Sequence, residues 1–302
     1  MKLKLLLVFL LVLTGCQPAT PSADTIHLLV PAGAPTISTL PLFDREGIEV
    51  EVASGADLVQ AALVNPSAPY EMVIAPINLG VNLLINGDSS YLLHSVVSWG
   101  NLYLVGAKDA LNQPDVTVGV FGQQSIVGKV FEQIRQNEPS LLQATIEWYG
   151  SVSQAQTALL GEHVDVAVLA MPAAQATIVK AQQQGHSYQL LMDLQERYEA
   201  HEGRQSFPQA ALFVHKDAYE KHAEAIDSIV DVMQGYLKEP LNLVEKIEAI
   251  GSDQLGLPSA NLIKSTYDLL ALDVVKASSI KRDVRDFLKS INMELKDEYL
   301  IP

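Results

Sequence analysis

Cysteine is nearly absent from this chain of 302 residues, in which Cys16 is the only one. A single cysteine excludes any disulfide bond within the chain. Basic residues are also scarce, since 20 Lys and Arg stand against 35 Asp and Glu and give a formal net charge of −15. Because nucleic-acid binding needs a basic face, this balance argues against nucleic acid as the partner.

Sequence signatures of catalysis are missing as well. The chain contains no Gly-x-Ser-x-Gly, no His-Glu-x-x-His and no phosphate-binding loop. Its histidines are scattered singly, and His163 with Asp165 makes only a weak metal pair that we interpret as solvated. We therefore predict no catalytic residue, no metal and no cofactor. Beyond the first 15 residues, no apolar segment approaches the length of a membrane-spanning helix.

The N-terminus does carry a strong signal. Lys2 and Lys4 precede an apolar run from Leu5 to Leu13, which is too short to span a bilayer. The following Leu13-Thr14-Gly15-Cys16 resembles the lipobox of bacterial lipoproteins. The resemblance implies a signal peptide over 1–15 and a diacylglycerol, with acyl chains such as palmitate, on Cys16. Residues 16–24 have the composition of a flexible tether, so we expect a protein held by lipid on the extracytoplasmic face of the cell membrane.

From Thr25 onward the pattern alternates between strands and helices, which predicts an α/β fold with mostly parallel sheets. Two blocks of strands indicate two lobes. We assign 25–105 with 210–302 to lobe one and 106–209 to lobe two, with crossings over Leu102–Val105 and Ala210–Val214. After Asp217 the strand signal stops, and four helical segments follow.

A strand, a glycine turn and a helix follow one another from Val116 to Arg135. Val116, Val118 and Val120 alternate as a strand does, and Ser125 is placed to cap the helix after Gly122. Such a junction offers free N–H groups to a small ligand. The same pattern is also typical of an ordinary strand-to-helix turn, and from this stretch alone the plain turn is the stronger interpretation.

Several short motifs resemble one known family in their order and spacing. They are Val30-Pro-Ala-Gly-Ala-Pro35, Tyr70-Glu-Met-Val-Ile-Ala-Pro76, Asn101-Leu-Tyr-Leu-Val105, Val118-Gly-Val-Phe-Gly-Gln-Gln-Ser125, Ala158 to Pro172, and Phe207-Pro-Gln-Ala-Ala-Leu-Phe-Val214. Together they resemble the substrate-binding proteins of ATP-driven (ABC) importers that handle nitrate, sulfonates such as taurine, and pyrimidine precursors of thiamine. The resemblance covers roughly residues 25–292. It implies a two-lobed type II periplasmic-binding-protein fold that closes over a ligand and works with an ABC permease and ATPase. It also implies that the C-terminal helical segments pack on lobe one.

The family's ligand contacts come from loops between the lobes. Carried over by position, the resemblance implies ligand-binding roles for Gly33, Ala34, Pro35, Pro76, Ile77, Asn78, Trp99, Asn101, Gly122, Gln123, Ser125, Ser151, Ser153, Met171 and Pro172. Capping or turn duty is an equally good interpretation of Asn78, Gln123 and Ser125.

The same loops lack charge. Segments 31–38, 75–82, 98–103, 121–128, 149–157 and 170–177 contain no Asp, Glu, Lys or Arg. A cleft built from them favours a neutral or weakly charged molecule with a ring, because fixed anions usually recruit Arg. Stacking on that ring is one role for Trp99, Phe121, Trp148 and Tyr149, and core packing is the other.

The sequence therefore predicts a monomeric solute-binding lipoprotein of an importer. A ligand-sensing or adhesin lipoprotein is an alternative, and an enzyme on the same fold is a weaker one. The fungal pyrimidine synthase of thiamine biosynthesis resembles this family, but its cysteine-rich iron motif is absent here.

Overall fold

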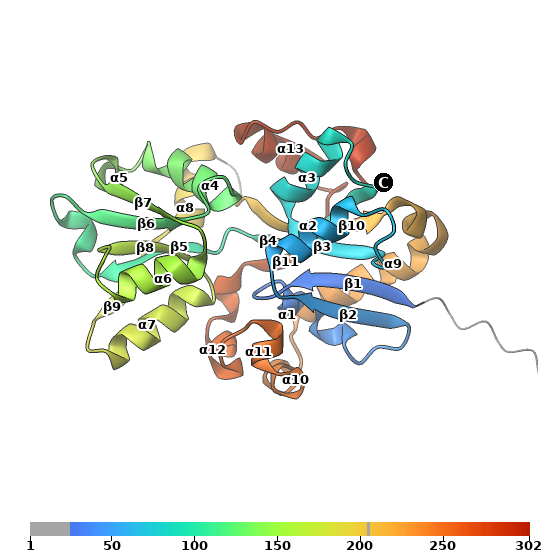
Figure 1. Cartoon of the computed structure of the whole chain (residues 1–302), viewed down its shortest axis with the longest axis horizontal. Coiled ribbons are helices and arrows are strands. Elements are labelled where there is room, and N and C mark those ends of the chain that lie inside the picture. Colours follow the sequence, from blue (N-terminus) through green and yellow to red (C-terminus); the bar gives the residue numbers. More distant parts are fainter. Residues whose placement is uncertain (1–24, 204–205) are drawn as a thin grey trace, which may run out of the picture.

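The computed structural model describes residues 25–203 and 206–302. The predicted signal peptide, the tether and the lipid site at Cys16 lie outside these residues. Within the described ranges, no helix is both long and apolar enough to cross a membrane. The chain forms two α/β lobes side by side (Figure 1).

Lobe one is built on a six-stranded sheet in the order β11-β4-β10-β3-β1-β2. Its strands β1, β2 and β3 are parallel, with β2 at the edge of the sheet, whereas β10 runs antiparallel to both β3 and β4, and β11 runs antiparallel to β4. The bounds are β1 (Ile26–Pro31), β2 (Ile48–Ala53), β3 (Met72–Pro76), β4 (Tyr91–Trp99), β10 (Pro208–His215) and β11 (Leu272–Lys276).

Lobe two is built on a five-stranded sheet in the order β7-β6-β8-β5-β9. Here β6 is parallel to β7 and β8, and β5 is antiparallel to β8 and β9. The bounds are β5 (Leu102–Ala107), β6 (Thr117–Phe121), β7 (Thr145–Tyr149), β8 (Val166–Ala170) and β9 (Tyr188–Asp193).

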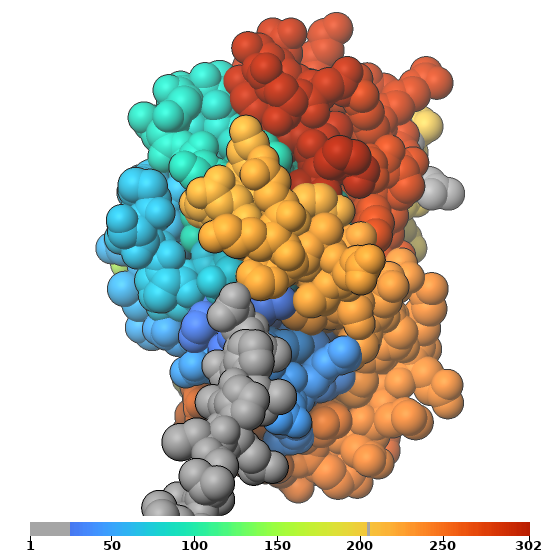
Figure 2. Space-filling model, turned by 90° about the vertical axis from the view of Figure 1, so that its right-hand side faces the viewer, coloured from blue at the N-terminus to red at the C-terminus, as the bar shows by residue number. Residues whose placement is uncertain are grey.

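Helices cover both faces of each sheet, because alternate strand residues point to opposite faces and both sets are apolar. In β1, Leu29 packs in one buried cluster with residues of α2, α3 and α13, while Leu28 and Val30 pack in a second cluster with residues of α1 and α9. The C-terminal helices form much of the end of lobe one (Figure 2). The bounds are α1 (Thr36–Thr39), α2 (Ala56–Val64), α3 (Ile77–Asn86), α4 (Ile126–Arg135), α5 (Pro139–Leu142), α6 (Val152–Leu160), α7 (Ala173–Gln183), α8 (Leu194–Glu202), α9 (Lys216–Lys238), α10 (Leu243–Ile250), α11 (Ser252–Leu255), α12 (Ala260–Ser265) and α13 (Lys281–Ser290).

The predicted fold class is confirmed, with four corrections. The sheets are mixed rather than mostly parallel, because each holds strands that reverse direction next to a crossing. The segment 102–105 was assigned to lobe one as a crossing, but its pairing with β8 and β9 places it inside the second sheet. The segment 210–214, expected as the other crossing, lies inside the first sheet as part of β10. In addition, β11 is a strand in the region where only helices were expected.

The first passage between the lobes is therefore a tight bend between β4 and β5. Gly100 and Asn101 both adopt the left-handed region, with φ of 56° and 62°. Gly100 donates its N–H at 2.9 Å to the carbonyl of Phe207, the residue just before β10. The bend between β4 and β5 is therefore hydrogen-bonded to the chain that enters β10, which is the second passage between the lobes. A Cβ at Gly100 would lie 2.0 Å from Oε1 of Gln195 in α8. Only glycine fits this position without movement of a neighbour.

The end of α13 also reaches lobe two. Gln133 of α4 donates from Nε2 to the Ser290 carbonyl at 2.9 Å, and Lys129 donates from Nζ to the Ile291 carbonyl at 3.5 Å. These carbonyls lie at the C-terminal end of α13, where helix carbonyls lack partners within the helix. The last helix thus contacts both lobes and not lobe one alone.

Candidate functional site

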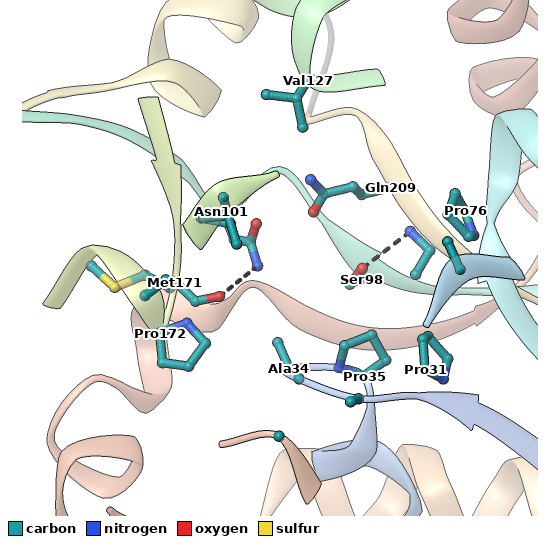
Figure 3. Close-up of a pocket in the computed structure, with 18 of the residues that line it drawn as sticks. Pro31, Ala34, Pro35, Pro76, Ser98, Asn101, Val127, Met171, Pro172 and Gln209 are labelled. Carbon is teal, nitrogen blue, oxygen red and sulfur yellow. Dashed lines mark hydrogen bonds between the residues drawn. The ribbon is translucent and has the colours of Figure 1, made fainter. Parts of the chain in front are cut away.

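A cavity of about 770 Å³ lies between the lobes. Lobe one contributes the carboxyl ends of β1, β2 and β3, and lobe two contributes those of β6 and β8 with the first turns of α4, α6 and α7 (Figure 3). This is the edge at which open α/β sheets bind ligands. Its volume falls within the range of small-molecule sites.

Nine of the predicted site residues line this cavity. They are Gly33, Ala34, Pro35, Pro76, Asn78, Asn101, Ser125, Met171 and Pro172. They come from five separate segments and both lobes, so the fold brings together residues that are far apart in the sequence. Their joint position supports the expected site, and their contact with a ligand stays a prediction.

The structure places the other six elsewhere. Ile77 is fully buried in the core, and the indole Nε1 of Trp99 donates to the Asp273 carbonyl of β11 at 3.1 Å. Gln123 lines a separate, smaller cavity against the end of α13. Gly122, Ser151 and Ser153 do not line the main cavity, and the latter two are exposed. Ser151 caps α6 by accepting from the Gln154 N–H at 3.3 Å, which is the capping duty expected of such a residue.

Several lining residues were not anticipated. They include Ala53 to Ala56 after β2, Ser98, Val127, Gln156, Gln209, and Gly256 to Pro258. The first group follows a parallel strand, so the rule about carboxyl ends applied to it as well. The last group comes from the loop between α11 and α12. That loop is held against the start of α1 by the hydrogen bond from the Gly33 N–H to the Leu255 carbonyl at 2.8 Å.

Among the described residues that line the cavity, none is charged and none has a titratable side chain. The wall thus holds no general acid or base for proton transfer. It is largely apolar, and Pro31, Pro35, Pro76, Pro172 and Pro258 all contribute to it. The N-termini of α2, α3, α4, α6 and α7 also reach it, and their first N–H groups provide donors and a weakly positive potential.

The hydroxyls in the cavity are largely committed to the backbone. Ser125 donates to the Gly122 carbonyl at 2.7 Å and accepts from the Val127 N–H at 3.2 Å, which caps α4. Ser98 accepts from the Ala210 N–H at 3.1 Å (Figure 3). Ser125 is therefore used as donor and acceptor, whereas the Ser98 hydroxyl can still donate, so recognition of a polar ligand falls on Ser98 and the side-chain amides.

A buried polar cluster lies away from the cavity, between β4, α9 and β11. His94 contacts Oδ1 of Asp227 through Nε2 at 3.0 Å and the Ser95 hydroxyl through Nδ1 at 2.7 Å. Burial lowers the pKa of His94, and hydrogen bonding to Asp227 opposes that shift. Burial alone would raise the pKa of Asp227, but hydrogen bonds from Lys276 and His94 lower it. The neutral imidazole therefore donates from Nε2 and accepts from Ser95. His94 and Ser95 are buried while Asp227 and Lys276 are partly exposed, and their hydrogen bonds connect β4, α9 and β11.

No family model and no curated protein matches the chain. Solved structures do match it over most of its length. An ABC transporter protein from Parabacteroides distasonis is 20% identical, with a TM-score of 0.73 over 92% of this chain and 99% of that one. The periplasmic aliphatic sulphonate-binding protein of Escherichia coli is 12% identical, with a TM-score of 0.65 over 92% of each chain. The chain has the two-lobed fold of periplasmic binding proteins.

A third solved structure with the same binding-protein fold comes from another organism. The ligand-binding component of an ABC-type import system from Staphylococcus aureus is 14% identical, with a TM-score of 0.61 over 92% of this chain and 97% of that one. At such identities the likeness concerns the binding-protein fold alone, so the ligand has to be argued from the cavity itself.

Proposed function

We propose that this protein is an extracytoplasmic solute-binding lipoprotein that captures a small molecule between its lobes and delivers it to an ABC importer. The observation that carries the proposal is the uncharged cavity of about 770 Å³, lined by loops from both lobes. Two lobes joined by two short passages can close on a ligand by a hinge motion. Contacts to both lobes then stabilise the closed form.

The location and partners follow from two further observations. The lipobox-like segment ending at Cys16 supports a lipid anchor on the extracytoplasmic face. The structures with the same fold are named as parts of ABC transporters or import systems, which supports a permease and an ATPase as partners. A monomer is the form that we propose for the capture step.

The ligand that we propose is neutral or weakly charged and carries a ring or another apolar portion. The apolar wall supports the ring, and the lack of Arg and Lys among the described lining residues argues against a strongly anionic ligand. Of the four aromatic residues considered for stacking, only Phe121 lines the cavity.

The experiment is a thermal-shift screen of the chain without its leader, with neutral heterocycles, amides, neutral amino acids, alkyl sulfonates and nitrate. A ligand at about 100 times its dissociation constant adds roughly 2.7 kcal/mol to the free energy of unfolding, which raises Tm by several degrees. Absence of any shift with the whole panel would remove the support for capture and favour a sensing or adhesive role.

A matched pair of variants on α7 locates the binding site. Ala176 lines the cavity, so Ala176→Arg places a bulky cation there and should abolish the ligand-induced shift. Gln183 is exposed at the end of the same helix, so Gln183→Arg adds the same charge without reaching the cavity and should keep the shift. Equal ligand-induced shifts in both variants would show that the ligand binds outside this cavity.

A further inference from the structure

Gln156 of α6 presents a fixed hydrogen-bond acceptor to the cavity that it lines. Its Nε2 donates to the Ala173 carbonyl at 3.3 Å and to the Thr177 hydroxyl at 2.7 Å. A carbonyl oxygen can only accept, so the atom facing Ala173 must be the nitrogen. The Thr177 hydroxyl donates to the same carbonyl at 2.8 Å and is left to accept from Gln156. Both amide hydrogens are therefore used, and only Oε1 remains for a ligand.

Asn101 is held in the same way. Its Nδ2 donates to the Met171 carbonyl at 3.3 Å, which fixes the orientation of the amide (Figure 3). The backbone is fixed as well, since the Met171 N–H donates to the Asn101 carbonyl at 3.0 Å. The residue is only 4% exposed, and its Oδ1 is buried without a hydrogen-bond partner among the described residues. An acceptor left unpaired in this way is unfavourable until a donor reaches it.

The two amides share one supporting segment. Both donate their N–H groups to backbone carbonyls in the loop that opens α7, at Met171 and Ala173. Neither amide can turn its nitrogen toward the cavity without breaking a hydrogen bond to that loop. At Gln156 the wall of lobe two therefore offers an oxygen acceptor and no side-chain N–H donor, whereas Asn101 keeps the second N–H of its Nδ2 and has its Oδ1 covered by the protein.

We infer that Gln156 sets the ligand specificity of the cleft, which takes a neutral molecule that donates an N–H or O–H group to its Oε1. The inference rests on the proposed capture function. The chemical class is that of primary and secondary amides, ureas and amino- or oxo-substituted heterocycles with ring N–H groups. A sulfonate, carboxylate or nitrate oxygen placed against Oε1 of Gln156 meets an acceptor and is repelled there, even though the helix N-termini supply N–H donors elsewhere in the cavity. A site built to accept a hydrogen bond strongly discriminates against analogues that cannot donate one.

The test uses matched probes on the unmodified protein and thermal shift with calorimetry as the readout. Uracil is paired with 1,3-dimethyluracil, nicotinamide with N,N-dimethylnicotinamide, and benzamide with benzoate and benzenesulfonate. We expect thermal shifts only from probes that carry N–H groups. The affinity of the matched N-methylated or anionic compound should be about 10- to 100-fold lower. This comparison needs no variant, so it holds even where a substitution disturbs folding.

Variants then assign the effect to a residue. Gln156→Met keeps the length of the side chain and removes the acceptor, so it should lower the affinity for the N–H-bearing probe by about 10-fold or more. Gln182→Met is the control, because Gln182 is exposed on α7 and does not line the cavity. A dimethylated or anionic probe that binds as well as its partner, or a Gln156→Met variant with unchanged affinity, would overturn the inference and leave capture standing. Silence across the whole panel would count against capture and against the inference together.

Discussion

Gly100 offers a sharp test of the passage between the lobes, through the substitution Gly100→Ala. Its φ of 56° lies in the left-handed region, which costs an alanine about 1–2 kcal/mol. The new Cβ would also stand 2.0 Å from Oε1 of Gln195, so that side chain has to move. Its movement weakens the 3.4 Å contact from the Asn101 N–H to Oε1, which is long for a hydrogen bond and adds little. We expect the free energy of unfolding to fall by about 1–3 kcal/mol.

Gly235→Ala is the matched control. Gly235 is exposed inside α9, its φ is not in the left-handed region, and a Cβ there meets nothing within 4 Å. The same added methyl group should therefore stabilise the protein by about 0.5–1 kcal/mol, because alanine loses less backbone freedom in a helix.

Urea unfolding followed by tryptophan fluorescence measures both variants. The prediction is a lower midpoint for Gly100→Ala and an unchanged or higher midpoint for Gly235→Ala. Equal midpoints would refute the reasoning, since both the left-handed backbone and the crowded Cβ position at Gly100 are absent at Gly235.

Two more predictions concern residues outside the cavity. Because burial lowers the pKa of His94 below its ordinary 6.5, the unfolded chain binds this proton more readily. Neutral His94 contributes its full stabilisation of the fold at pH values above 6.5, and this contribution is lost as the pH falls below 6.5. Urea midpoints between about pH 7 and about pH 5 should drop more in the wild type than in His94→Gln, and parallel curves would contradict this. The lowered pKa of Asp227 acts in the same direction but only at more acidic pH. Trp99→Phe removes a hydrogen bond to a β11 carbonyl and should lower the free energy of unfolding by about 1 kcal/mol, with the affinity for a ligand of the cavity unchanged. A lower affinity in this variant would show that Trp99 contributes to the binding site.

The sequence was sufficient for most of the strands and for the core of the candidate site. Alternating apolar residues marked β2 and β6. The family resemblance, and not a local pattern, supplied Gly33, Pro76 and Met171, which lie near the carboxyl ends of strands and line the cavity. The absence of charge in the loops was likewise visible from composition, and it holds for the described residues that line the cavity.

The remainder depended on tertiary placement. The pattern of 102–105 indicates a strand but not which sheet it joins, because membership is decided by pairing with β8 and β9. Leu272–Lys276 is short and directly follows a helical pattern, so the sequence gives no separate signal for the strand β11. Gln156 has no signal of its own, since its role comes from contacts with Ala173 and Thr177 on another helix. Gly256 to Pro258 reach the cavity only because the C-terminal helices pack against α1.

The direction of β1 has a mechanical consequence. The strand begins at the end of lobe one farthest from lobe two and delivers Pro31 to the cavity wall (Figure 1). At about 3.3 Å per residue it keeps Thr25 roughly 20 Å from the ligand position. Any pull from a membrane attachment before Thr25 then acts on lobe one alone. Such a pull would not act directly on lobe two, so the strand direction separates the attachment end of lobe one from the cavity.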